Sequence, residues 1–153
     1  MQFYAAYQGN ISPEDMQMFA EISEILRCLP DLTFDLDDPE WRNCKNQISC
    51  HLISRALARH FDVSVCDGYF TPGCQHSWLK TKGGSSIIDA YPVAGAAPFI
   101  VSAKWPSPWA KLYQESTRFQ EKFQTPEFAS RLEQTVRSVA EIIQQPDSKP
   151  PSS

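Results

Sequence analysis

Three residues in the middle of the chain have side chains suited to nucleophilic catalysis: Cys44, His76 and Asp89. The thiolate is the reactive form of a cysteine, and a free thiol is only a few per cent ionised at neutral pH. A helix N-terminus or a neighbouring imidazolium lowers the pKa of a thiol. An aspartate that binds the imidazole fixes its tautomer and stabilises its charged form. Brought together, these groups would attack an acyl carbon and protonate its leaving group.

The histidine and the aspartate are expected to meet because they lie on the two strands of one hairpin. The strands are predicted at residues 75–82 and 85–91, with Gly83-Gly84 as a tight turn between them. With that turn Trp78 faces Asp89, and His76 becomes a diagonal neighbour of Asp89 on the same face of the sheet. Diagonal Cα atoms lie roughly 7–8 Å apart, a distance that an imidazole and a carboxylate can span. A register shift of one residue would put the two side chains on opposite faces.

Two cysteines compete for the role of nucleophile, Cys44 and Cys50. Asn43 or Asn46 is predicted to cap a helix that runs to about His60, so that Cys44 stands at the start of this helix. Cys50 would then lie in mid-helix, where no free N–H groups remain to stabilise an anion. The free N–H groups beside Cys44 could instead hold a developing oxyanion. The expected nucleophile is therefore Cys44, with Cys50 as its rival.

The rest of the sequence predicts helices before and after a small antiparallel sheet, which makes the fold class α+β. Ser12 caps a first helix that begins at Pro13, carries one apolar stripe and ends before Pro30. The other predicted elements are strands at residues 63–70 and 99–102 and helices at residues 108–123 and 126–144. Residues 1–145 are expected to form a single domain, and residues 146–153, rich in proline and serine, a disordered tail.

Composition and charge argue against several classes of protein. A chain of 153 residues, 42% of them hydrophobic, is long enough to bury a core without help from disulfides or metal ions. A net charge of −4 argues against binding to nucleic acid. The sequence contains no run of 18 apolar residues, so it predicts no membrane span. The first residues lack the pattern of a signal peptide, and the expected compartment is therefore the cytoplasm. Acidic residues gather at positions 31–40, which indicates a solvated loop or a surface for a basic partner.

The five cysteines and three histidines do not have the spacing of a metal site. There is no Cys-x-x-Cys pair, and Cys74-Gln75-His76 is a poor zinc motif. The sequence also lacks a glycine-rich phosphate loop. We therefore expect no metal and no cofactor.

Four short motifs together resemble the core of the transglutaminase-like thiol enzymes, a branch of the papain-like superfamily. They are the helical segment 44–57, Asp67-Gly68-Tyr69, His76-Ser77-Trp78 and Ile87-Ile88-Asp89. The family shows the same order: a cysteine that opens a helix, Gly-Tyr at the end of the next strand, a His-Ala-Trp-like motif and an aspartate. The resemblance covers about 50 of the 153 residues.

The resemblance implies a papain-like core with added N- and C-terminal helices, and a catalytic triad. Cys44 would be the nucleophile, since its interval to the Gly-Tyr motif fits the family better than that of Cys50. His76 would be the base and Asp89 its orienting partner. The expected substrate-binding residues are Trp78, Tyr91 and Asn46.

The activity implied is cysteine-dependent acyl chemistry on an amide bond of a protein or peptide. A covalent thioester would be resolved by hydrolysis, as in a thiol protease, by deamidation, or by acyl transfer. The alternative is a catalytically inactive transglutaminase-like module that binds other proteins. An exposed acidic surface and the aromatic residues near Trp105 would then serve the partner.

Overall fold

The computed structural model of the chain describes residues 4–6 (backbone only), 11–29, 48–71, 73–90, 98–103 and 110–145. In these ranges the helices are α1 (Pro13–Arg27), α2 (Cys50–Ala58) and α3 (Pro126–Gln144). The strands are β1 (Tyr4–Ala6), β2 (Val63–Phe70), β3 (Gln75–Thr81), β4 (Ser86–Asp89), β5 (Phe99–Ser102) and β6 (Tyr113–Glu115). Short 3-10 helices are η3 (Lys82–Gly84), η5 (Ala110–Leu112) and η6 (Gln120–Gln124).

One sheet contains the six described strands in the order β1-β5-β4-β3-β2-β6. Neighbouring strands are antiparallel except β1 and β5, which run parallel. The α+β class is therefore confirmed. The sheet was expected to be antiparallel throughout, and it differs at its edge, where β1 runs parallel to β5. The predicted strands 63–70 and 99–102 have the bounds of β2 and β5.

The register predicted for the β3–β4 hairpin is confirmed. Leu79 pairs with Ile88 and Lys80 with Ile87, and the same register places Trp78 opposite Asp89. The turn is longer than the predicted two residues, because η3 lies between the strands. Gly83 and Gly84 still adopt positive φ angles of 77° and 71°, which only glycine accepts at low cost.

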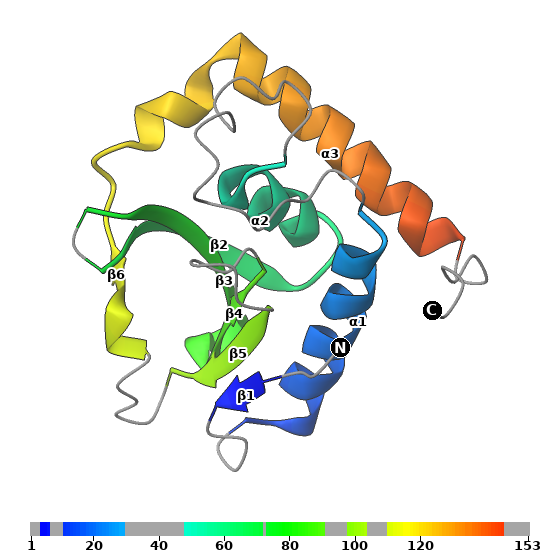
Figure 1. Cartoon of the computed structure of the whole chain (residues 1–153), viewed down its shortest axis with the longest axis vertical. Helices are drawn as coiled ribbons and strands as arrows, with labels where there is room; N and C mark the ends of the chain where they lie inside the picture. The colour runs from blue at the N-terminus through cyan, green and yellow to red at the C-terminus, as the bar shows by residue number, and fades with distance from the viewer. Residues whose placement is uncertain are drawn as a thin grey trace.

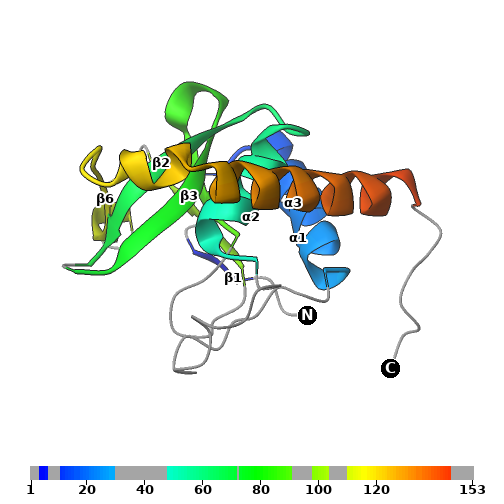
Figure 2. The ribbon, with the colours of Figure 1, turned by 90° about the horizontal axis from the view of Figure 1, so that it is seen from above.

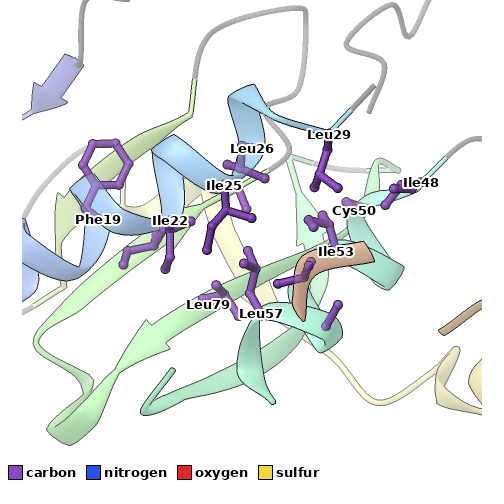
Figure 3. Packing of buried hydrophobic residues seen from close by; sticks show 14 of the residues in the cluster. Phe19, Ile22, Ile25, Leu26, Leu29, Ile48, Cys50, Ile53, Leu57 and Leu79 are labelled. Carbon is purple, nitrogen blue, oxygen red and sulfur yellow. The ribbon is translucent and has the colours of Figure 1, made fainter. Parts of the chain in front are cut away.

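Helix α2 lies between the sheet and α3, and α1 lies beside it (Figures 1 and 2). Its apolar side chains join those of α1 and of β3–β5 in the main core cluster, which Figure 3 shows from close by. Ile53, Ala56 and Leu57 are completely buried there. Burial of an isoleucine or leucine side chain contributes about 1.5–3 kcal/mol, so Ile53 and Leu57 hold α2 firmly on the sheet.

Two predicted helices differ from the structure. The helix expected from Asn43 or Asn46 to about His60 is described only as Cys50–Ala58, and its N-cap is Ser49, whose side chain accepts a hydrogen bond from the Leu52 N–H. The helix predicted at residues 108–123 is wrong: its described part consists of η5, β6 and η6. Backbone pairing of β6 with the edge of β2 determines the structure of this segment, and it overrides the helix that the local periodicity predicts.

A glycine permits this last pairing. Gly68 in β2 lies opposite Glu115, and a Cβ at Gly68 would overlap the carbonyl oxygen of Gln114. The close approach of the two backbones brings Tyr113 next to Phe70. Gly68 belongs to the Gly-Tyr motif of the sequence analysis, so the motif has a structural reason in this chain.

Candidate active site

Asp89 holds the imidazole of His76 in the interior of the protein. Nε2 of His76 lies 2.9 Å from Oδ1 and 2.8 Å from Oδ2 of Asp89. The exposed fraction is 2% for His76 and 0% for Asp89. The two residues come from β3 and β4, so the hairpin register brings them together as the sequence analysis expected.

Aromatic side chains enclose this pair. Tyr113 donates its hydroxyl to Oδ2 of Asp89 at 2.7 Å, and the ring of Trp78 stacks on His76 with centroids 6.2 Å apart. Phe70 meets His76 edge to face. Burial and the charge of Asp89 raise the pKa of Tyr113 far above its usual range, so its hydroxyl remains a proton donor. The imidazole is thereby fixed by one carboxylate and confined by three rings.

The thiol that the structure brings to His76 belongs to Cys50. Cys50 is the first residue of α2, and it lies at the Ile48 end of the core cluster (Figure 3). The side chains of His51 and His76 both act to lower the pKa of its thiol. As the first helical residue, it also lies where backbone N–H groups have no acceptor within the helix. The statement that Cys50 falls in mid-helix was therefore wrong, since the described helix begins at it.

The thiol and the imidazole have pKa values shifted in opposite directions. Burial would raise the pKa of Cys50, but its hydrogen bonds to His51 and His76 lower the value from 9.0 to about 6. Burial likewise opposes the charged form of His76, but the hydrogen bonds with Asp89 and Cys50 raise its pKa from 6.5 to about 10. These opposite shifts favour a thiolate beside an imidazolium.

This ion pair leads to a prediction for stability against pH. Folding transfers one proton from the Cys50 sulfur to the His76 ring, so from about pH 6.5 to 9 the folded and unfolded pairs bind equal numbers of protons. In Cys50→Ala only His76 remains, and its raised pKa gives stability that is complete below pH 6.5 and lost as the pH rises.

We expect the free energy of unfolding of Cys50→Ala to fall relative to the wild type between pH 7 and 9. The steepest slope is about 1.4 kcal/mol per pH unit, the value for one proton. Urea unfolding of both proteins at pH 7, 8 and 9 measures it. If the free energies of unfolding of the two proteins changed with pH in the same way, the result would contradict the ion pair.

Of the other predicted site residues, three lie outside the described ranges and one is buried beside His76. Cys44, Asn46 and Tyr91 lie outside the described residues. Trp78 is fully buried, and its ring packs on the imidazole of His76. Cys66 lies in a second core cluster, and burial together with Glu115 raises the pKa of its thiol to about 12, which makes it unreactive at neutral pH.

Sequence reasoning missed two residues that contact the site. Tyr113 was placed in a helix, and the only local signal for a strand was its aromatic ring at the end of a short apolar stretch. His51 was interpreted as structural, yet it lowers the pKa of the same thiol as His76 does. Its position next to Cys50 in the sequence was the available signal.

Within the described ranges no group of three or more His, Cys, Asp or Glu side chains is arranged to hold a metal ion. No described helix is both long enough and apolar enough to cross a membrane.

Comparisons with protein-family models, with curated proteins and with solved structures find no match for this chain.

Proposed function

We propose that the chain is a thiol enzyme that catalyses acyl chemistry through a covalent thioester on Cys50. The observation that carries this proposal is the buried His76–Asp89 pair, in which the carboxylate binds Nε2 of His76, together with the opposite pKa shifts that His76 and Cys50 cause in each other. The thiol stands at a helix N-terminus, the position that favours an anion. A perturbed thiol, an imidazole and an orienting carboxylate in contact are the groups that such chemistry needs.

The first half of the reaction forms the thioester. The Cys50 thiolate attacks the acyl carbon, a C–S bond forms, and the carbonyl oxygen becomes an oxyanion near the N–H groups at the start of α2. Nε2 of His76 is occupied by Asp89, so Nδ1 is the nitrogen that faces the reaction. Its proton moves to the leaving amine as the C–N bond breaks. His76 is then neutral, and Asp89 keeps it oriented.

The second half releases the acyl group. His76 Nδ1 accepts a proton from water or an incoming amine, whose lone pair attacks the thioester carbon. The C–S bond breaks, the electron pair returns to sulfur, and the thiolate–imidazolium pair is restored. Water yields a carboxylic acid, whereas an amine yields a new amide.

The order of elements supports a transglutaminase-like relationship. A cysteine at a helix start is followed by β2, which carries Gly68, by β3 with His76 and by β4 with Asp89. The resemblance supplies the substrate class, an amide bond in a protein or peptide. In this proposal Cys50 takes the role expected for Cys44, because Cys50 is the described cysteine whose thiol pKa His76 lowers.

An activated ester tests the proposal without knowledge of the natural substrate. With p-nitrophenyl acetate the wild type is expected to give a burst of nitrophenolate, then steady turnover, and a peptide map should show one acetyl group on Cys50. Cys50→Ala should lose burst and turnover. The matched variant Cys44→Ala should keep both.

Three results would contradict the proposal. An acetyl group trapped on Cys44 would return the role of nucleophile to that residue. Acetylation of Cys50 that is never hydrolysed would show a reactive thiol without catalysis. Absence of any burst would favour the inactive binding module.

A further inference from the structure

Tyr113 reaches Asp89 from the far edge of the sheet. Strands β4 and β6 are separated by β3 and β2, so in a flat sheet they would lie about 14 Å apart, three times the usual spacing between strands. Side chains that stand upright on such a sheet could not meet. The hydroxyl of Tyr113 nevertheless lies 2.7 Å from Oδ2 of Asp89. The sheet is therefore curled, and the curl brings a phenol to the carboxylate that holds His76.

The Asp89 carboxylate serves two donors at once. Nε2 of His76 lies 2.9 Å from Oδ1 and 2.8 Å from Oδ2, and the Tyr113 hydroxyl shares Oδ2. An ionised carboxylate only accepts hydrogen bonds, so both partners donate. All three side chains are buried, and hydrogen bonds are electrostatically stronger there than in water. Tyr113 therefore stabilises negative charge that would otherwise act on His76 alone.

We propose that Tyr113 is a positioning residue whose hydroxyl shares the Asp89 carboxylate with His76 and thereby weakens the hold of that carboxylate on the imidazole proton. This proposal rests on the proposed function and deepens it. Tyr113 acts through Asp89, without contact with the substrate.

The shared carboxylate matters most in the thioester intermediate. The sulfur then carries an acyl group and no charge, so no thiolate helps to keep His76 protonated. Nδ1 of His76 must be free of a proton to accept one from the attacking water. Asp89 opposes this, because a carboxylate beside an imidazole favours its charged form. The Tyr113 hydroxyl reduces the effect, since it stabilises the carboxylate when His76 is neutral.

A variant without the thiol isolates this effect. Among the described residues, the titratable groups that act on His76 or lie against its ring are Asp89 from β4, Cys50 from α2 and Tyr113 from β6. Cys50→Ala imitates the uncharged sulfur of the intermediate. In this background Tyr113→Phe keeps the ring and removes only the hydroxyl. It should raise the pKa of His76 by about one unit, the lower end of the effect of a neighbouring charge.

NMR titration of the three histidines measures this pKa. The matched control is Tyr69→Phe in the same background. Tyr69 lies on β2, where its ring packs against Phe119. The control should leave the pKa of His76 unchanged.

The pH profile of turnover gives the functional readout. After the burst with p-nitrophenyl acetate, steady turnover reports release of the acetyl group, and it rises with pH as His76 loses its proton. In Tyr113→Phe the midpoint of this rise should move up by about one pH unit, so that turnover below the midpoint falls about tenfold. A merely structural defect would lower the rate at every pH and leave the midpoint in place.

The outcomes separate this proposal from the proposed function. A wild-type burst, with a turnover midpoint and a His76 pKa that Tyr113→Phe leaves unchanged, would overturn the role of Tyr113 alone. Absence of a burst in the wild type would overturn the proposed function, and the role of Tyr113 with it. If Tyr113→Phe does not fold, replacement of the tyrosines by 3-fluorotyrosine decides. Its more acidic phenol is a stronger donor, so a lowered pKa of His76 supports the proposal and an unchanged pKa overturns it.

Discussion

Asp89→Ala is expected to lower the free energy of unfolding by about 3–5 kcal/mol, the cost of breaking a buried ion pair by removing one partner. Asp89 is fully buried, and its carboxylate receives both His76 and the hydroxyl of Tyr113. In the variant, the imidazole of His76 and the hydroxyl of Tyr113 stay buried but lose the carboxylate to which both are hydrogen-bonded. Chemical denaturation at pH 7 measures the loss.

The matched control is Asp62→Ala. Asp62 also pairs with a cation, Lys82, at 3.5 Å, but both side chains are mostly exposed. Such surface pairs contribute little, so the control should change stability by no more than about 0.5 kcal/mol. Equal losses in the two variants would contradict the buried pair. A smaller loss than that of Asp89→Ala is expected for Tyr113→Phe, which removes only one hydrogen bond.

His76→Ala is expected to slow alkylation of Cys50 at pH 6.5 by roughly tenfold. Loss of the hydrogen bond and charge of His76 returns the thiol pKa from about 6 toward its ordinary range, so the thiolate fraction falls by about two orders of magnitude. The more basic thiolate is in turn about one order of magnitude more nucleophilic, which offsets part of the loss. Rates of iodoacetamide incorporation into the Cys50 peptide measure the difference.

Two controls belong to this measurement. His60→Ala, at an exposed histidine, should leave the rate unchanged. Cys66 in the same protein should react slowly throughout, because burial and Glu115 raise its thiol pKa to about 12. A His76→Ala rate equal to that of the wild type would show that another group ionises Cys50.

The meeting of His76 with Asp89 could be predicted from sequence because every step was local. A Gly-Gly turn fixes which residues pair, and the period of two in a strand then fixes which side chains share a face. The prediction held even though the turn was longer than expected, since Thr81 closes it by accepting the N–H of Ser86.

The nucleophile was harder to predict because helix starts are poorly determined by local sequence. Asn43, Asn46 and Ser49 are all good N-cap residues, and capping energies of about 1 kcal/mol do not separate them. Ser49 caps the described helix, and the apolar positions that follow it pack in the core. Tertiary packing thus selects the start of α2, and with it the cysteine that stands there.

Tyr113 could not be found from local sequence for a related reason. Its place depends on Gly68, more than forty residues earlier, whose missing side chain lets β6 approach β2. Nothing near Tyr113 in the sequence records that contact. The hydrogen bond of His51 was likewise hidden, because its partner Ser77 lies in another element, β3.

The central claim is that Cys50 is the activated nucleophile, and limited alkylation of the wild type tests it most directly. The native protein would be treated with substoichiometric iodoacetamide at pH 6.5 and all five cysteines mapped by mass. The account predicts that the Cys50 peptide carries most of the label, ahead of Cys28, Cys44, Cys66 and Cys74. Label that gathers on Cys44, or that spreads evenly over the five thiols, would contradict it.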